Sequence, residues 1–203
     1  MTRKMQLILM AAGNSQRFGA NKLLFPVRGK AMYRHLFDHL VRYATFEDPA
    51  SQITVVSQYR EILHAGERMK FDSIENPDPD AGISLTIRLA LSAHRWQQIE
   101  PIRKRQSAAV FFTADQPNLT YESIVAFVRR AAETPAGLLS AAGETFSGNP
   151  VSFDAIYFDE LKALTGDRGG KVVLNRYPED REWFPMTAEE LRDIDTQEQL
   201  KDG

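Results

Sequence analysis

Short apolar runs alternate with amphipathic stretches along the first two thirds of the 203-residue chain. The apolar runs have the length of buried strands. The stretches between them repeat apolar residues every three or four positions, which predicts helices with one buried face. The expected strands are residues 6–10, 53–57, 71–75, 108–113 and 137–142, and the expected helices are residues 30–44, 60–68, 84–96 and 120–132.

This regular alternation of strand and helix predicts the fold class. It is typical of an α/β protein in which a mostly parallel, Rossmann-like sheet is covered by helices on both faces, as a three-layer α/β/α sandwich. The last third of the chain is less regular. It predicts strands at 149–153 and 182–184, helices at 158–164 and 196–201, a turn at 165–170, and either helix or strand at 172–175.

The composition fits a folded protein, with 43% hydrophobic and 26% charged residues. The formal net charge of −2 gives no overall attraction to nucleic acid or to a membrane. The first apolar run is too short to span a bilayer and leads directly into a glycine-containing loop, so we expect a cytoplasmic protein. The absence of cysteine excludes disulfides, thiolate nucleophiles and cysteine-ligated metal centres.

The loop after the first expected strand, residues 11–22, carries the strongest chemical signal. Its small residues would let a ligand approach the backbone, and Gly13 can adopt a positive φ without strain. Successive amide N–H groups form a cradle for anions, to which Arg17 and Lys22 add positive charge. The loop matches neither the dinucleotide-binding glycine motif nor the Walker A motif. Open α/β sheets bind ligands at the carboxyl ends of their strands, so we expect an anionic ligand here.

Residues 9–26 follow the pattern L-x-A-A-G-x-S-x-R-x-G-x-x-K-L-L-x-P. This pattern resembles the signature of nucleotidyltransferases, and is most similar to the molybdenum cofactor cytidylyltransferases and their guanylyltransferase relatives. The resemblance implies the nucleotide-diphospho-sugar transferase type of fold. It also implies one domain over residues 1–203, with a nucleotide-binding part at about 1–117 and an acceptor-facing part at about 118–203. Further blocks follow in the family's order, at residues 76–77, 82–86, 113–117, 148–151, 165–167 and 193–196.

The resemblance also implies roles for individual residues. Transfer of a nucleotidyl group between anionic reactants needs a hard divalent cation, Mg²⁺ or Mn²⁺, for which Asp115 and Asp195 are the implied ligands. Asp193 is an alternative to Asp195. Lys22 would contact the triphosphate and Arg17 the leaving pyrophosphate, as the catalytic pair. The implied nucleotide-binding residues are Ala11, Ala12, Gly13, Ser15, Arg17, Lys22, Asn76, Gly82, Thr86 and Ala114, and the implied acceptor-binding residues are Gly148, Asn149, Pro150 and Asp167.

The family pattern leaves the acceptor open. Asn149 stands where the family has histidine, and Leu85 where it usually has serine. The Ala-Ala-Gly sequence at 11–13 favours CTP over GTP. The leading hypothesis is therefore Mg²⁺-dependent transfer of CMP from CTP to the terminal phosphate of a molybdopterin cofactor, with a molybdoenzyme as recipient of the product. The alternatives are a guanylyl- or sugar-phosphate nucleotidyltransferase and a non-catalytic carrier of the cofactor, although a carrier would not need two metal-binding carboxylates.

Overall fold

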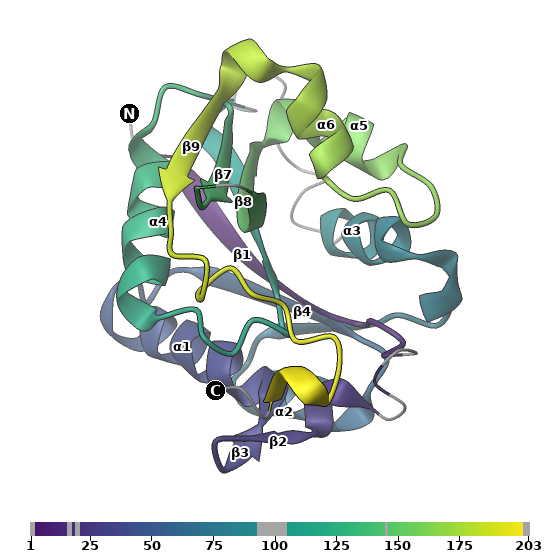
Figure 1. The fold of residues 1–203 in the computed structure, drawn as a ribbon. Helices are drawn as coiled ribbons and strands as arrows, with labels where there is room; N and C mark the ends of the chain where they lie inside the picture. The colour runs from purple at the N-terminus through teal and green to yellow at the C-terminus, as the bar shows by residue number, and fades with distance from the viewer. Residues whose placement is uncertain (1–2, 16–17, 19–20, 93–104, 145, 201–203) are drawn as a thin grey trace.

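A seven-stranded sheet forms the centre of the protein in the computed structural model, which describes residues 3–15, 18, 21–92, 105–144 and 146–200 (Figure 1). The strand order across the sheet is β5-β4-β1-β6-β8-β7-β9. The strands are β1 (Lys4–Ala11), β4 (Gln52–Ser57), β5 (Asp72–Glu75), β6 (Ser107–Thr113), β7 (Leu138–Ala142), β8 (Ser147–Asp154) and β9 (Arg181–Pro185).

The sheet is mostly parallel, as predicted. β5, β4, β1 and β6 run in one direction, and β8 runs antiparallel to both of its neighbours, β6 and β7. β9 pairs parallel with β7. β8 reverses direction because it is joined to β7 by a short hairpin connection instead of a crossover helix. β8 also pairs with β6, so it lies between β6 and β7. β6 and β7 follow each other along the chain and run in the same direction, but they are not neighbours in the sheet.

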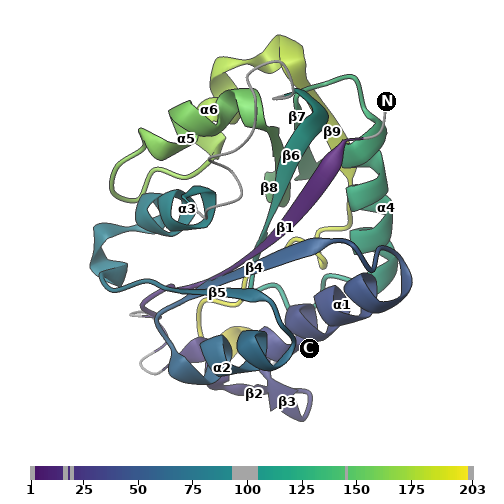
Figure 2. The same cartoon turned by 180° about the vertical axis from the view of Figure 1, so that it is seen from behind.

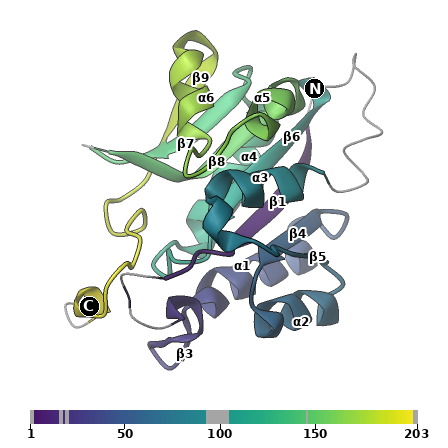
Figure 3. The same cartoon turned by 90° about the vertical axis from the view of Figure 1, so that its right-hand side faces the viewer.

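Helices cover both faces of the sheet, which confirms the three-layer sandwich (Figures 2 and 3). Alternate residues of β1 point to opposite faces. Leu7 and Leu9 pack in one core with α1, α2 and α4, while Ile8 and Met10 pack in a second core with α3, α5 and α6. The helices are α1 (Met32–Phe46), α2 (Arg60–Arg68), α3 (Ile83–Leu91), α4 (Tyr121–Glu133), α5 (Phe158–Lys162) and α6 (Lys171–Arg176).

The structure departs from the predicted elements in a few places. Residues 30–31, expected at the start of a helix, pair instead as β3 (Lys30–Ala31) with β2 (Pro26–Val27). Arg28 and Gly29 have positive φ, which is the backbone that a two-residue hairpin turn requires. The expected helix at 196–201 is reduced to a 3-10 turn at Glu198–Leu200, and residues 172–175 lie in α6. Residues 93–96 of the expected third helix lie outside the described residues.

The C-terminal segment brings the last part of the chain to the carboxyl ends of β1 and β6. After β9 it crosses the molecule and returns to the loops that follow these strands (Figure 1). The amide of Ile194 donates to the carbonyl of Asp115 at 3.0 Å, and the Gln197 side chain donates to the carbonyl of Phe18 at 3.2 Å. In the described part of the chain, none of the helices has the length and apolar character needed to cross a membrane.

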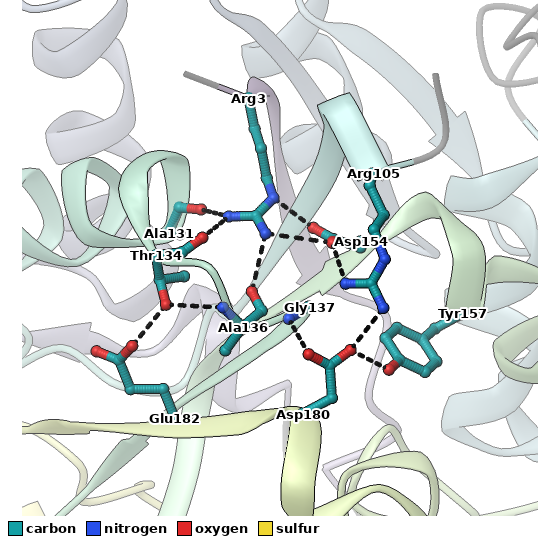
Figure 4. Close-up of polar contacts among 10 residues, drawn as sticks. All are labelled: Arg3, Arg105, Ala131, Thr134, Ala136, Gly137, Asp154, Tyr157, Asp180 and Glu182. Atoms are coloured by element: carbon teal, nitrogen blue, oxygen red, sulfur yellow. Dashed lines mark hydrogen bonds and ion pairs between the residues drawn. The ribbon is translucent and has the colours of Figure 1, made fainter. Parts of the chain in front are cut away.

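An ion pair between Arg3 and Asp154 joins the start of β1 to the end of β8 (Figure 4). Arg3 Nε lies 2.7 Å from Asp154 Oδ1, and the guanidinium also donates to the carbonyls of Ala131, Thr134 and Ala136. Asp154 is fully buried. Burial raises the pKa of Asp154 to about 7, although the charge of Arg3 acts in the opposite direction. Arg3 is therefore the main partner that offsets the buried charge of Asp154, and Arg105 Nη1 lies farther away, at 3.8 Å from Asp154 Oδ2.

We expect the Arg3→Met variant to lose up to about 3–5 kcal/mol of unfolding free energy at pH values above 7, where Asp154 is ionised in the wild type, because the variant leaves this carboxyl group buried without its main partner. The loss should shrink as the pH falls through about 7, because Asp154 then becomes protonated in the folded wild type as well, and the ion pair that the variant lacks no longer contributes. Denaturant unfolding between about pH 5 and 9 measures this dependence.

Arg130→Met is the matched control, since it removes an arginine from a partly exposed pair with Glu182. This variant should lose much less unfolding free energy than Arg3→Met, because an exposed ion pair contributes little, and the loss should not depend on pH between about 5 and 9. A loss in Arg3→Met that is equally large at every pH would contradict the assignment of the buried charge to Asp154.

Candidate active site

A cleft of about 470 Å³ opens at the carboxyl ends of β1 and β6. Its walls are the loop after β1, the segment at 79–86, the residues that follow β6, and the C-terminal segment. Many residues that the sequence singled out line this one cleft. They are Ala12, Gly13, Ser15, Lys22, Gly82, Thr86, Ala114, Asp115, Asp167 and Asp195.

The remaining candidate residues lie elsewhere. Ala11 is buried in β1, and the buried Asn76 donates from Nδ2 to Thr86 Oγ1 at 3.1 Å, so it supports the cleft wall from behind. Gly148 and Asn149 line a second, neighbouring pocket, while Pro150 is buried and lines neither cavity. Arg17 lies outside the described residues.

Lys22 lies between two carboxylates in the cleft. It begins a short 3-10 helix (Lys22–Leu24), for which the Asn21 side chain accepts a hydrogen bond from the Leu23 amide. Lys22 Nζ is 2.8 Å from Asp115 Oδ2 and 2.9 Å from Asp195 Oδ1, and the lysine is buried. Burial alone would lower the pKa of Lys22, but the two carboxylates raise it, so the ammonium group carries its charge at neutral pH.

The same two carboxylates suit a hard divalent cation. Both point at one position, and the second oxygen of Asp115, Oδ1, is buried and has no hydrogen-bond partner within the described residues. No group of three or more histidine, aspartate or glutamate side chains in the described ranges could hold a metal by itself. Two carboxylates are sufficient for Mg²⁺ when phosphate oxygens complete its shell, so Asp115 and Asp195 fit a cation that arrives with a nucleotide.

Asp193 differs from Asp195 in its surroundings. It does not line the cleft, whereas Asp195 does. Although much of the Asp193 residue is exposed, burial of its carboxyl group and the nearby charge of Asp115 raise the pKa of Asp193 to about 6. The contacts with Lys22 therefore favour Asp195 as the partner of Asp115 in this site.

The loop after β1 leaves room for a ligand beside its backbone, as the sequence predicted, but the residue with a positive φ is not the glycine. Gly13 does not have a positive φ; Ser15 does, at 52°. A Cβ placed on Gly13 would meet no atom within 4 Å. Ser15 Oγ accepts a hydrogen bond from the Lys22 amide at 3.2 Å, which ties the loop to the 3-10 helix. Gly13 thus leaves space in the cleft.

Two cleft residues that the sequence did not assign meet across its opening. Asn14 Nδ2 donates to Asp80 Oδ1 at 2.5 Å, and both residues line the cleft. Asn14 belongs to the loop after β1, and Asp80 to a 3-10 helix (Pro79–Ala81). The only signal for Asp80 was its position in a proline-rich turn before Gly82.

Gly82 joins the segment at 79–86 to the turn at 165–170. It has a φ of 84°, and a Cβ at this position would lie 2.4 Å from the backbone carbon of Gly166. The amide of Ser84 donates to the Gly166 carbonyl at 3.2 Å, and Asp167 lines the same cleft. The nucleotide and acceptor segments implied by the family pattern are therefore in direct backbone contact.

The second pocket, of about 190 Å³, adjoins the cleft and shares Met10 and Ile83 with it. Much of its lining is apolar, with Phe111, Phe153 and Leu161 among the residues that form it. On β8, residues 149–150 are skipped in the pairing register between Ser140↔Val151 and Ala141↔Gly148. This irregularity opens the strand where the pocket lies.

Comparison with known proteins places the chain in a family. The comparison defines the protein as a nucleotidyltransferase. The chain belongs to the family of the MobA-like NTP transferase domain, whose model matches residues 7–181. A comparison with functionally curated proteins found no match.

Solved structures share the fold across almost the whole chain. Rv0371c from Mycobacterium tuberculosis H37Rv is 19% identical, with a TM-score of 0.73 over 98% of this chain and 97% of that one. A complex of Rv0371c with manganese has a TM-score of 0.71, with the same identity and coverage. Molybdopterin-guanine dinucleotide biosynthesis protein A from Archaeoglobus fulgidus is 14% identical, with a TM-score of 0.68 over 98% and 96% of the chains. CMP:2-keto-3-deoxy-manno-octonic acid synthetase, solved with CTP, is 10% identical, with a TM-score of 0.69 and the same coverage.

Two glycine variants separate packing from ligand space. We expect Gly82→Ala to lower the unfolding free energy by about 1–3 kcal/mol, because it strains the backbone and meets Gly166. Gly13→Ala should change it by less than about 0.5 kcal/mol, since the new methyl group meets no protein atom, but should weaken triphosphate binding. Denaturant unfolding and calorimetric titration measure the two effects. A strongly destabilised Gly13→Ala, or one with unchanged triphosphate affinity, would contradict this division.

Proposed function

We propose that this protein transfers CMP from CTP to the terminal phosphate of a molybdopterin-type acceptor, with Mg²⁺ or Mn²⁺ and with release of pyrophosphate. The observation that carries the proposal is the meeting of Lys22, Asp115 and Asp195 in a cleft bordered by the Ala-Ala-Gly loop. This combination supplies a positive charge, hard anionic ligands and a small-residue backbone, which are the groups that a triphosphate with its cation needs.

The nucleotide would lie along the loop after β1. Its triphosphate would contact the backbone of residues 12–15 and the ammonium group of Lys22, while Gly82 and Thr86 would lie beside the base and ribose. Asp115 and Asp195 would hold the divalent cation, which when bound neutralises triphosphate charge and polarises the α-phosphate. By the family pattern, Arg17 would bind the pyrophosphate.

The reaction needs positioning more than a protein nucleophile. An oxygen of the acceptor phosphate attacks the α-phosphorus of CTP, and the bond from that phosphorus to the bridging oxygen breaks, so that pyrophosphate leaves with the electron pair. Lys22 would stabilise the negative charge that builds up around the α-phosphate. In the absence of a ligand, Asp115 and Asp195 raise the pKa of Lys22 against the effect of burial, so the side chain is protonated before the nucleotide binds.

The acceptor would occupy the second pocket. Gly148 and Asn149 line it, and Asp167 lines the adjoining cleft. Because the two cavities share Met10 and Ile83, an acceptor could place its phosphate in the cleft and its body in the apolar pocket. This arrangement supports a compact acceptor with a ring system and a phosphate arm. Asn149 in place of histidine removes a titratable group from the acceptor side.

Pyrophosphate release tests the proposal directly. The protein is incubated with each of the four nucleoside triphosphates, with Mg²⁺ or Mn²⁺, before and after addition of the molybdenum-loaded pterin. We expect release from CTP only when the pterin is present. Release from GTP alone would favour a guanylyltransferase, and release with a sugar phosphate in place of the pterin would favour a sugar-phosphate nucleotidyltransferase. Nucleotide and pterin binding without any release would identify a carrier.

Three carboxylate variants test the assigned cation ligands. Asp115→Asn and Asp195→Asn should each lower kcat at least about 100-fold, because each removes a preorganised charge from the reacting centre. Asp193→Asn is the matched control in the same segment, and should keep kcat within about threefold. Each variant keeps the side-chain shape, so the melting temperature can verify folding. An active Asp115→Asn protein, or a control as inactive as Asp195→Asn, would refute the assignment.

A further inference from the structure

Three consecutive residues at the end of β4 bind the loop after β1. Their side chains donate hydrogen bonds to three successive carbonyl groups of that loop. The pairs are Ser57 Oγ to Ala11 O at 2.8 Å, Gln58 Nε2 to Ala12 O at 3.0 Å, and Tyr59 Oη to Gly13 O at 2.9 Å. Gln58 Nε2 also donates to Gly13 O, at 3.3 Å. The side chains of one connection thus fix the orientation of three peptide groups in the other.

This arrangement determines which way the loop amides point. In a trans peptide the carbonyl and the following N–H point in opposite directions. Since Gln58 and Tyr59 hold the carbonyls of Ala12 and Gly13, the N–H groups of Gly13 and Asn14 face away from them. Neither of these N–H groups makes a hydrogen bond within the described residues, and both residues line the cleft. Unpaired, oriented amides of this kind bind anions.

Gln58 extends the same control to the side chain of Asn14. Its Nε2 donates to Asn14 Oδ1 at 3.0 Å, which leaves Asn14 Nδ2 to donate to Asp80 across the cleft opening. Gln58 and Tyr59 themselves are half-buried, and neither lines the cleft. Any effect of these two side chains on a ligand must therefore pass through the loop that they hold.

We propose that Gln58 and Tyr59 are positioning residues that turn the loop amides toward the phosphates of the nucleotide. This inference rests on the proposed function. It predicts a difference between two ligands, because amides aimed at the β- and γ-phosphates contribute to binding of a triphosphate but not to binding of the corresponding monophosphate. Loss of either side chain should therefore lower the preference for CTP over CMP, whereas general loosening of the fold would weaken both ligands alike.

The test compares Tyr59→Phe and Gln58→Met with the wild type. Tyr59→Phe removes one hydroxyl group, and Gln58→Met keeps the side-chain length but removes the donor. Calorimetric titrations with CTP and with CMP in Mg²⁺ give the two dissociation constants. We expect the Kd for CTP to rise about 3- to 10-fold in each variant, as loss of one hydrogen bond predicts, and the Kd for CMP to stay within about twofold.

Tyr33→Phe is the matched control, because Tyr33 is a buried tyrosine whose hydroxyl makes no hydrogen bond within the described residues. It should keep both dissociation constants. Steady-state kinetics add a second readout: KM for the triphosphate should rise in the two variants while KM for the acceptor does not change. If both variants keep the wild-type ratio of the CTP and CMP dissociation constants, the positioning role is overturned. Failure of the wild type to bind any nucleoside triphosphate would overturn the proposed function, and this inference with it.

Discussion

The buried charge of Lys22 is the interaction on which this end of the molecule depends. An ammonium group out of contact with water is costly unless it is paired, and Lys22 is paired with two carboxylates from distant parts of the chain. Asp115 follows β6, and Asp195 is contributed by the returning C-terminal segment, 173 positions from Lys22 in sequence. The three groups therefore tie the first loop, the central strand and the end of the chain into one cleft.

The same pairing connects stability with the proposed chemistry. Without a nucleotide, the lysine supplies the positive charge that the two carboxylates need. With a triphosphate in the cleft, a divalent cation can take over that place and leave the ammonium group to the phosphates. Because Gln58 and Tyr59, which follow β4, hold the carbonyl groups of the loop, the cleft would meet the triphosphate with little rearrangement of its backbone. This preorganisation is what makes charge neutralisation effective in a reaction between two anions.

Local patterns explain why much of the fold could be predicted and why some of it could not. The central strands and α1, α2 and α4 could be predicted because the pattern of apolar and polar residues within each segment shows which of its positions are buried. The strands of the β2–β3 hairpin are too short to show a repeating pattern of apolar residues. The place of β8 in the sheet depends on its pairing with both β6 and β7, which are distant from one another in the sequence. The site divides in the same way. The family pattern indicated Lys22, Asp115 and Asp195 singly, whereas their contacts with one another are a long-range result of folding.

Other parts of the site left almost no signal in the sequence. Gln58 and Tyr59 look like ordinary polar residues at the end of a strand, and only their hydrogen bonds to the neighbouring loop distinguish them. Gly13 could adopt a positive φ but does not have one, and Ser15 has it instead. Side chains that act through the backbone of another segment need a structure to be found.

Binding of Mn²⁺ with and without CTP, followed by electron paramagnetic resonance, tests the central claim most directly. If Lys22 and a cation share Asp115 and Asp195, free Mn²⁺ should bind weakly to the wild type and much more tightly when CTP is present. Replacing Lys22 by methionine should strengthen binding of free Mn²⁺, because the competing ammonium group is gone. Mn²⁺ binding that is insensitive both to CTP and to Lys22→Met would contradict the account.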